Sequence, residues 1–507
     1  MKEKFKAIAK AAPPMIGYST ANILIGGGPY IIGLYFMMFL TEVEGLSFSQ
    51  ASLVVLIAKV WDAVIDPFLG LVSDRTRTRF GRRRPYFLLG ILPVALSYFC
   101  MWNSFGIPNN QGTAKMIYFM FAYVAFTTAC SLVSVPQSSL LPEAAPEYSL
   151  RVHYNSVGYM FNSVGMESAF LLTISLFGFT NTELFTPELK PKFMMMGALL
   201  GVFFALPLII TFFSTKEKDW RGVPKPELNL REVIWEYKTT FKSRAYRQYI
   251  VLPLVQYLCV NIWSSSMPFF LRYVAQLPEK LQLINTLAGV GQMSGFPLNY
   301  WLSLRYGKQT PAKLLTPLML VALLVSFFVR PVTYGANMNT TYIMMTISVM
   351  LFYFGFSGMG MTPSTIFPDT SDVDELITGR RREGVLSAVN TFTAQVAVGV
   401  GQAIFGWVSD AFGVKTGIGP ENEVPVQTDA AIWGLRVTFA ILPAILVVAS
   451  IILSRRFKMN KNDHVLIVRV IAEKKAQGTV TITAEEKATL ENLAGQRFED
   501  MWIGQAA

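Results

Sequence analysis

Residues 61–67 read WDAVIDP, so Asp62 and Asp66 lie four residues apart inside a long apolar run. The run begins with SLVVLIAKV (52–60) and continues after the acids with FLGLV (68–72). Residues four apart share one face of a helix, so the two carboxylates would be neighbours. A charged side chain in the middle of a membrane helix costs about 2.5–3.5 kcal/mol on insertion scales. The stretch therefore predicts a membrane-spanning helix whose two acids have a specific task.

The composition supports a membrane location. Of the 507 residues, 52% are hydrophobic and 15% are charged, whereas an ordinary soluble domain carries about 25% charged residues. About 20 apolar residues span a bilayer as a helix. We therefore predict an all-α membrane protein with twelve transmembrane helices, over 16–40, 48–72, 85–105, 114–140, 152–178, 191–214, 247–273, 281–304, 313–331, 341–366, 384–410 and 430–454.

Basic residues gather in the loops that follow even-numbered spans. SDRTRTRFGRRRP (73–85) follows span 2 and TGRRREG (378–384) follows span 10, while TEVEGLS (41–47) after span 1 has no basic residue. Because cytoplasmic loops are enriched in Lys and Arg, we expect both termini in the cytoplasm and the protein in the plasma (inner) membrane. The net charge of +11 then reflects topology and not nucleic-acid binding. The basic start lacks a cleavage site after an early apolar stretch, so we expect no removable signal peptide.

A long loop divides the spans into two groups of six. The expected domains are an N-terminal six-helix bundle (1–214), a cytoplasmic middle loop with an amphipathic helix (215–246), a C-terminal six-helix bundle (247–455) and a cytoplasmic tail (456–507). This layout is typical of transporters whose two bundles face each other across a central cavity. In the tail, Thr483 and Glu486 have the spacing of a capping box, for a short helix that ends near Gly495.

Motifs for catalysis are missing from the sequence. It contains no GxxxxGK[ST] phosphate loop, and its two histidines, His153 and His464, lie in no zinc or nucleophile motif. The three cysteines show no metal spacing and are expected to be buried thiols. We expect a transporter, without an organic cofactor, that functions as a monomer in the lipid bilayer.

The acid pair of span 2 has three interpretations. Two ionised carboxylates on one helix face repel each other unless a cation bridges them, one is protonated, or a basic partner compensates them. The first two describe a coupling-ion site, for Na⁺ or for H⁺. In the third, Lys59 and arginines on other helices neutralise Asp62 and Asp66 in a structural ion network.

Three further features have two interpretations each. Glu167 in span 5 either contacts substrate or carries a proton, or it pairs with a buried Arg or Tyr and fixes packing. Gly26–Gly28 in span 1 either allow a kink or close helix packing, or form a broken helix that lines a cavity. The charged loops either report topology alone or also form salt bridges between the bundles that hold one access state. The residues of such bridges would be Asp74, Arg75, Arg82, Asp369, Asp372, Arg380 and Arg381.

Several motifs together resemble one transporter family. KVWDAVIDPFLGLVSDRTRTRFGRRRP (59–85) resembles the signature of the glycoside–pentoside–hexuronide:cation symporters, the melibiose-permease-like branch of the major facilitator superfamily. SVPQSSLLPE (134–143), PDTSDVDELITGRRREG (368–384) and the ending LENLAGQRFEDMW (490–502) continue the resemblance. The resemblance implies the major facilitator fold and sugar symport by alternating access. By this resemblance Asp62, Asp66 and Ser131 match cation-binding positions, and Thr391 matches a position near the sugar site.

The sequence departs from the family pattern at several charged positions. Gly26 and Ser134 stand where melibiose-permease-like members carry sugar-binding aspartates, and Tyr159 replaces a cavity arginine. Gln395 replaces a lysine near the ion site, and Ile65 replaces an asparagine between the two acids. The coupling ion is therefore expected to be either H⁺ or Na⁺, and the acid pair is a metal site only if the ion is Na⁺.

Apart from one acid, the expected substrate site is neutral and polar. Its residues are Asn22, Tyr30, Ser134, Gln137, Tyr159, Glu167, Thr391 and Gln395. Such groups suit the many hydroxyls of a sugar, whereas an acidic hexuronide would require fixed cations. We therefore expect cation-coupled uptake of a neutral glycoside or oligosaccharide. The alternatives are cation-coupled transport of a lysolipid or another amphiphile, and a non-transporting sensor whose tail signals to a partner.

Overall fold

A computed structural model describes residues 13–108, 111–144, 148–179, 185–217, 235, 238–277, 280–330, 338–380, 382–416, 425–456, 459 and 461–504. These residues form helices and connecting loops, and the one β-bridge among them joins Thr78 to Gly81. The chain divides into two compact units, 1–228 with 402–431, and 229–401 with 432–507. Of the middle-loop helix expected over 230–246, residues 230–234, 236 and 237 lie outside the described residues, 238–240 are helical, and the last three residues belong to the next long helix.

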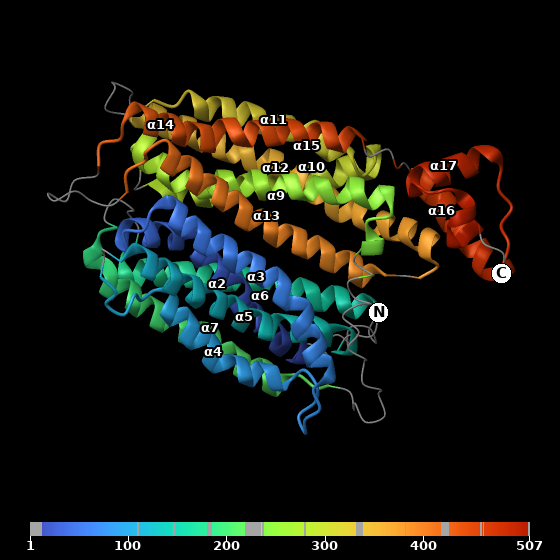
Figure 1. The fold of residues 1–507 in the computed structure, drawn as a ribbon, viewed down its shortest axis with the longest axis horizontal. Coiled ribbons are helices and arrows are strands. Elements are labelled where there is room, and N and C mark those ends of the chain that lie inside the picture. The colour runs from blue at the N-terminus through green and yellow to red at the C-terminus, as the bar shows by residue number, and fades with distance from the viewer. Residues whose placement is uncertain are drawn as a thin grey trace. The chain divides into compact units, whose positions relative to one another are not determined.

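The first unit contains the helices of the first six predicted spans (Figure 1). They are α2 (Asn22–Ile31) with the π-helical turns η1 (Ile32–Phe36) and η2 (Phe39–Val43), α3 (Phe48–Arg75), α4 (Pro85–Met101), α5 (Gly112–Ala144), α6 (Tyr148–Phe177) and α7 (Lys190–Ser214), which follows the short η4 (Pro187–Leu189). Within this unit α2 packs on α6, and α3 packs on α5.

The second unit contains the helices of the later spans and the tail. They are α9 (Arg244–Phe269) with η5 (Phe270–Val274), α10 (Leu281–Tyr306), α11 (Thr310–Phe327), α12 (Met338–Thr378), α13 (Glu383–Ala411), α14 (Asp429–Arg436) with η8 (Val437–Ile441), α15 (Leu442–Arg456), α16 (Lys461–Gln477), α17 (Ala484–Ala494), η9 (Phe498–Asp500) and η10 (Trp502–Gly504). The final residues of α13 group with the first unit.

The described helices account for all twelve predicted spans. Eight of them are long and apolar enough to cross a membrane on their own, and α4 is a shorter apolar helix. The helix that holds the acid pair, α3, is interrupted by charge at Lys59, Asp62 and Asp66, although its 28 residues exceed the length of a span. One boundary was wrong by more than two turns. α12 continues from the predicted end at 366 to Thr378, so the acidic stretch SDVDEL (371–376) lies on a helix.

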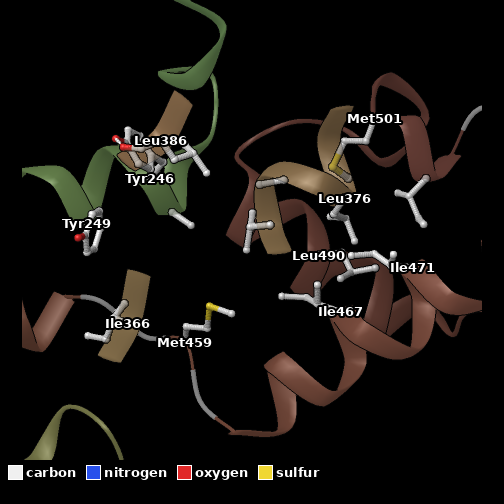
Figure 2. Packing of buried hydrophobic residues seen from close by; sticks show 14 of the residues in the cluster. Tyr246, Tyr249, Ile366, Leu376, Leu386, Met459, Ile467, Ile471, Leu490 and Met501 are labelled. Carbon is white, nitrogen blue, oxygen red and sulfur yellow. Dashed lines mark hydrogen bonds between the residues drawn. The ribbon is translucent and has the colours of Figure 1, made fainter. Parts of the chain in front are cut away.

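The tail packs as part of the second unit. The predicted capping box is present, because the Thr483 hydroxyl and the Glu486 carboxylate each accept a backbone N–H of the other residue, and α17 ends at Gly495. Figure 2 shows Leu376 of α12 facing Ile467 and Ile471 of α16 and Leu490 of α17. These four side chains belong to one buried cluster that also includes Tyr246 and Tyr249 of α9, Leu386 of α13, Met459 and Met501. The tail therefore shares a hydrophobic core with the ends of three transmembrane helices.

Candidate functional site

The start of α3 is held by two independent caps. The Ser47 side chain accepts the backbone N–H of Gln50, and the Gln50 side chain accepts the N–H of Ser47. In addition, the carboxylate of Asp410, near the end of α13, accepts the N–H of Phe48 at 3.1 Å and of Ser49 at 2.8 Å. Because the first amides of a helix have no partner within it, these acceptors anchor the helix that carries the acid pair.

Asp62 and its predicted hydroxyl partner lie together in the structure. The hydroxyl of Ser131 on α5 donates a hydrogen bond of 3.1 Å to Oδ1 of Asp62, and both side chains are buried. Lys59, one turn earlier on α3, interacts electrostatically with Asp62 and Asp66 and with Tyr123 of α5. Lys59 is thus a charge partner of the pair, which is compatible with the network interpretation and with a coupling-ion site.

Asp66 also interacts with Ser131 and Lys59, but one of its carboxylate oxygens lacks a donor. Its Oδ1 atom is buried and accepts no hydrogen bond from any residue that the structure describes. A buried carboxylate oxygen without a donor is costly, because it has lost water and gained nothing in its place. With Lys59 charged and both acids ionised, the three groups sum to one negative charge. One monovalent cation would balance this site.

The three glycines of span 1 serve close helix packing. Gly26, Gly27 and Gly28 are buried, and a Cβ atom added to Gly27 would lie 2.6 Å from the carbonyl oxygen of Gly165 on α6. This contact supports the packing interpretation over the broken-helix one at this point of the chain. The same packing places Tyr30 beside α6, where its ring lies 6.1 Å from that of Phe170 and its hydroxyl interacts with Glu167.

One predicted substrate residue has a structural role. The side-chain amide of Gln137 donates to the carbonyl of Tyr18 at 3.0 Å, and the Tyr18 hydroxyl donates to the carbonyl of Gln137 at 2.9 Å. Both residues are buried, so these two hydrogen bonds connect α5 to the first span. Nothing in the sequence pattern marks Tyr18 as the partner.

The other predicted substrate residues differ in exposure. Ser134 and Asn22 are half-buried, and the Asn22 amide donates to the carbonyl of Ser19 at 3.2 Å. Tyr159 on α6 is 76% exposed, and Glu167, two turns further on, is also exposed. Thr391, exposed, and Gln395, half-buried, lie on the part of α13 that belongs to the second unit. Their participation in a common site with the first-unit residues stays a prediction.

Charged loop residues form an ion network at one end of the first unit. Arg83 pairs with Asp74 at 2.6 Å and with Glu143 of α5 at 2.8 Å. Arg82 pairs with the same Glu143 at 2.5 Å, and the Glu217 carboxylate accepts its backbone N–H at 2.8 Å. Asp74 and Arg82 were predicted as gating residues, whereas Arg83, Glu143 and Glu217 were not. The motifs that contain the last three gave no sign of which pairs would form.

The second unit has its own network at the end of α12. Asp369 pairs with Lys308 at 2.7 Å, and Asp372 lies 3.0 Å from the ring nitrogen of His464 in the tail. Arg382, which was not predicted, holds both oxygens of Asp374 at 2.7 and 3.0 Å. Of the other predicted gating residues, Arg75 is half-buried, Arg380 is exposed and Arg381 lies outside the described residues. Each of these ion pairs joins two residues of the same unit, so salt bridges between the bundles stay a prediction.

Comparison with known proteins identifies the family. Residues 17–461 match the model of the family described as MFS/sugar transport protein, so the chain belongs to that family. The inner membrane symporter YicJ of Escherichia coli is 27% identical, over 88% of this chain and 90% of that protein. The isoprimeverose transporter of Lactiplantibacillus pentosus is 23% identical, over 78% and 79%. The sodium-dependent lysophosphatidylcholine symporter 1-A of Danio rerio is 22% identical, over 88% and 86%.

Solved structures agree with this assignment at the level of the fold. The crystal structure of the nucleoside transporter NupG has a TM-score of 0.62 and 11% identity, and the match covers 89% of this chain and 99% of that one. The expected major facilitator fold with twelve helices and the resemblance to the glycoside–pentoside–hexuronide symporters are thus confirmed. The chain is a multi-pass membrane transporter and not an enzyme.

Proposed function

We propose that this member of the MFS/sugar transport family is a symporter that couples inward movement of H⁺ or Na⁺ to uptake of a neutral glycoside or oligosaccharide. The two six-helix bundles, 1–214 and 247–455, would alternate access to a central substrate site. Both termini would lie in the cytoplasm, with the protein acting as a monomer in the plasma membrane.

The observation that carries the coupling role is the state of the acid pair. Ser131 and Lys59 interact with both acids, while Asp66 keeps a buried oxygen with no donor among the described residues. A proton on Asp66 would remove its unbalanced charge, and a sodium ion could be held by carboxylate oxygens and the Ser131 hydroxyl. Ionisable residues inside a membrane helix mark ion or substrate pathways.

The sugar part of the proposal rests on relatives and on the polar residues. One relative is named an isoprimeverose transporter, and the family description names sugar transport. The predicted substrate residues are Asn22, Tyr30, Ser134, Gln137, Tyr159, Glu167, Thr391 and Gln395. The Gln137 amide nitrogen donates to Tyr18, and its side-chain oxygen has no partner among the described residues. The hydroxyl, amide and carboxylate groups of these residues are suited to hydrogen bonding with a sugar.

The test is solute uptake into proteoliposomes that contain the purified protein. A panel of glycosides is offered with an imposed pH gradient, a Na⁺ gradient, or neither. Asp62→Asn and Asp66→Asn should each abolish accumulation against a gradient while the proteins remain monodisperse in detergent. Accumulation at the wild-type level in both variants would refute the coupling role of the pair.

Two alternatives are included in the same experiment. The zebrafish relative named for lysophosphatidylcholine makes that lipid a second solute for the panel. Uptake of lysophosphatidylcholine without uptake of any glycoside would identify an amphiphile transporter. A sensor would transport neither solute, and removal of the tail after residue 456 would then abolish binding to its partner.

A further inference from the structure

We propose that Glu167 of α6, together with the hydroxyl of Tyr30, forms a hydroxyl-accepting subsite that selects neutral glycosides over anionic ones. The inference rests on the proposed function and adds a residue that determines specificity.

One stripe on the exposed side of α6 is polar and contains a single charge. It consists of Ser156, Tyr159, Ser163 and Glu167, which follow one another at spacings of three or four residues, and the exposed apolar side chains of Met160, Val164 and Leu171 lie beside it. Between His153 and Phe177 the helix has no lysine or arginine and no second acid. Of the eight described helices that could cross the membrane alone, this one has the smallest buried share. The stripe is therefore not part of the protein core.

An exposed carboxylate in a spanning helix indicates water. Glu167 lies near the middle of the span, and no described residue forms an ion pair or hydrogen bond with it. Acids within membrane helices face the protein interior or a water-filled path, because contact with lipid tails is too costly. Since Glu167 is not buried in protein, its side of α6 lines an aqueous path.

Close helix packing holds Tyr30 next to this acid. The opposite side of α6 carries Gly158 and Gly165, and a Cβ atom on Gly165 would lie 2.7 Å from the Cα atom of Ile23. With Gly27 packed on the Gly165 carbonyl, α2 cannot slide along α6 without a clash. Tyr30, one turn after Gly27, then contacts Phe170 and interacts electrostatically with Glu167. The register between α2 and α6 thus places Tyr30 next to Glu167.

The chemistry of the pair suits a polyol and disfavours an anion. An ionised carboxylate only accepts hydrogen bonds, at up to about four positions, while a tyrosine hydroxyl both donates and accepts. Adjacent hydroxyls of a neutral sugar can donate to the carboxylate and accept from the tyrosine. A hexuronide would bring its own carboxylate near Glu167, and the helix offers no compensating Lys or Arg between His153 and Phe177. Glu167 and Tyr30 would thus favour binding of a neutral sugar and disfavour binding of a hexuronide.

The experiment measures binding of two probes to the purified full-length protein. The probes are a set of neutral 4-nitrophenyl glycosides, including the glucoside, galactoside and xyloside, and 4-nitrophenyl glucuronide. A hydrogen bond to a charged group contributes about 1.5–3 kcal/mol, so Glu167→Gln should weaken binding of the preferred neutral glycoside about 10-fold or more. The same variant should lower the ratio of neutral-glycoside to glucuronide affinity by a similar factor.

Tyr30→Phe supplies a second variant that keeps the ring contact with Phe170 and removes only the hydroxyl. This variant should weaken binding of the neutral glycoside several-fold. Ser168→Ala is the matched control, because the Ser168 hydroxyl is already bonded to the Val164 carbonyl of its own helix at 2.5 Å. Its affinities should equal those of the wild type.

Water exposure is measured separately, in protein lacking Cys100, Cys130 and Cys259. The Ser163→Cys variant should react with a membrane-impermeant thiol reagent, and the neutral glycoside should slow this reaction. The Leu92→Cys variant, at an exposed apolar position of α4, should not react.

The outcomes separate this inference from the proposed function. If the wild type binds neutral glycosides, but Glu167→Gln and Tyr30→Phe leave both the affinity and the selectivity ratio unchanged, the subsite is wrong and glycoside transport stands. An unreactive cysteine at Ser163 would also overturn the subsite, even if Glu167→Gln did not fold. If the wild type binds no glycoside, the proposed function fails, and the inference fails with it.

Discussion

The carboxylate of Asp410 accepts the backbone N–H groups of Phe48 and Ser49, at 3.1 and 2.8 Å. The two segments are brought close by Gly406, where an added Cβ atom would lie 2.6 Å from the Phe48 carbonyl oxygen. The rings of Phe48 and Phe405 also meet edge to face. An acid at the end of α13 thus caps the helix that carries the acid pair Asp62 and Asp66.

Replacing Asp410 with Ala should loosen the first turn of α3. The loss of an acidic helix cap costs about 1 kcal/mol, and the Ser47 capping box remains to limit the damage. Hydrogen exchange of the amides in 48–52 should therefore be about five-fold faster. Asp429→Ala, an acid in the first turn of α14, is the control and should leave this segment unchanged. Equal exchange in the Asp410 variant and the wild type would mean that the cap contributes nothing.

The hydrogen bond from Ser131 to Asp62 should affect the coupling ion more than the fold. Ser131→Ala removes a donor to a carboxylate, an interaction of about 1.5–3 kcal/mol. The Na⁺ or H⁺ concentration for half-maximal uptake should shift about 10-fold or more, at an unchanged maximal rate. Ser138→Ala, whose hydroxyl bonds to the Val135 carbonyl of its own helix, provides the control. An unshifted ion dependence would remove Ser131 from the ion site.

Arg83 should be the most important residue of the first-unit network for stability. It is buried and serves both Asp74 and Glu143, so Arg83→Gln leaves Asp74 without its partner and Glu143 with Arg82 alone. Removal of one member of a buried ion pair costs about 3–5 kcal/mol. The unfolding midpoint in detergent should fall clearly for this variant. Arg79→Gln makes the same charge change at an exposed loop position and should have little effect. Equal stability of the two variants would refute this ranking.

The twelve spans were predictable because a bilayer requires long apolar helices, which any sequence must display. The contact between Asp62 and Ser131, 69 positions apart, was predictable only through the resemblance to the family. Partners chosen by tertiary packing were not predictable. The Gln137 side chain donates a hydrogen bond to the main chain of Tyr18, a contact that neither residue type nor spacing predicts.

In the tail, the helix with local capping signals was predictable, and the helix that depends on tertiary packing was not. Thr483, Glu486 and Gly495 carry local capping signals, and the structure confirms that helix. The preceding helix α16 was not predicted, because much of its apolar surface meets α12 and α17 and its charges meet Asp372 and Glu375. The sequence of such a helix resembles that of an ordinary soluble helix, and its docking surface is recognised only once the partner helices are known.

Gly379 should be required for docking of the tail. Its φ of 69° lies in the left-handed region, and an added Cβ atom would lie 2.7 Å from the Trp502 ring. Gly379→Ala therefore combines about 1–2 kcal/mol of backbone strain with a clash. The tail should detach more often, so trypsin should cleave faster after Lys475, which is paired with Glu375 in the docked state.

Gly384 provides a matched control for the Gly379 variant. It lies in the same charged segment, and a Cβ atom there would meet no described atom within 4 Å. Gly384→Ala should leave the cleavage rate at the wild-type value. If both variants are cleaved at that rate, the contact between Gly379 and Trp502 does not hold the tail.

The start of α17 should weaken in acid and not in base. The Thr483 N–H donates to Glu486 at 2.9 Å and Arg469 donates to it at 2.8 Å, and together they lower the pKa of the Glu486 carboxyl. A lowered folded-state pKa means that the stabilisation is present above the unfolded pKa of about 4.3 and is lost as the pH falls through the folded value. Hydrogen exchange of residues 484–488, normalised to an unstructured peptide, should therefore be constant near neutral pH and rise below about pH 4.

Two single variants test whether Glu486 causes this acid response. Glu486→Gln cannot be titrated, so exchange at the start of α17 should be faster than in the wild type at pH 7 and should no longer rise in acid. Glu485→Gln removes the neighbouring acid, which lies outside the bonds to Thr483 and Arg469, and should keep the wild-type profile. An acid response that persists in Glu486→Gln would assign it to another group, with Glu499 the first to examine because its bond to Lys487 also lowers its pKa.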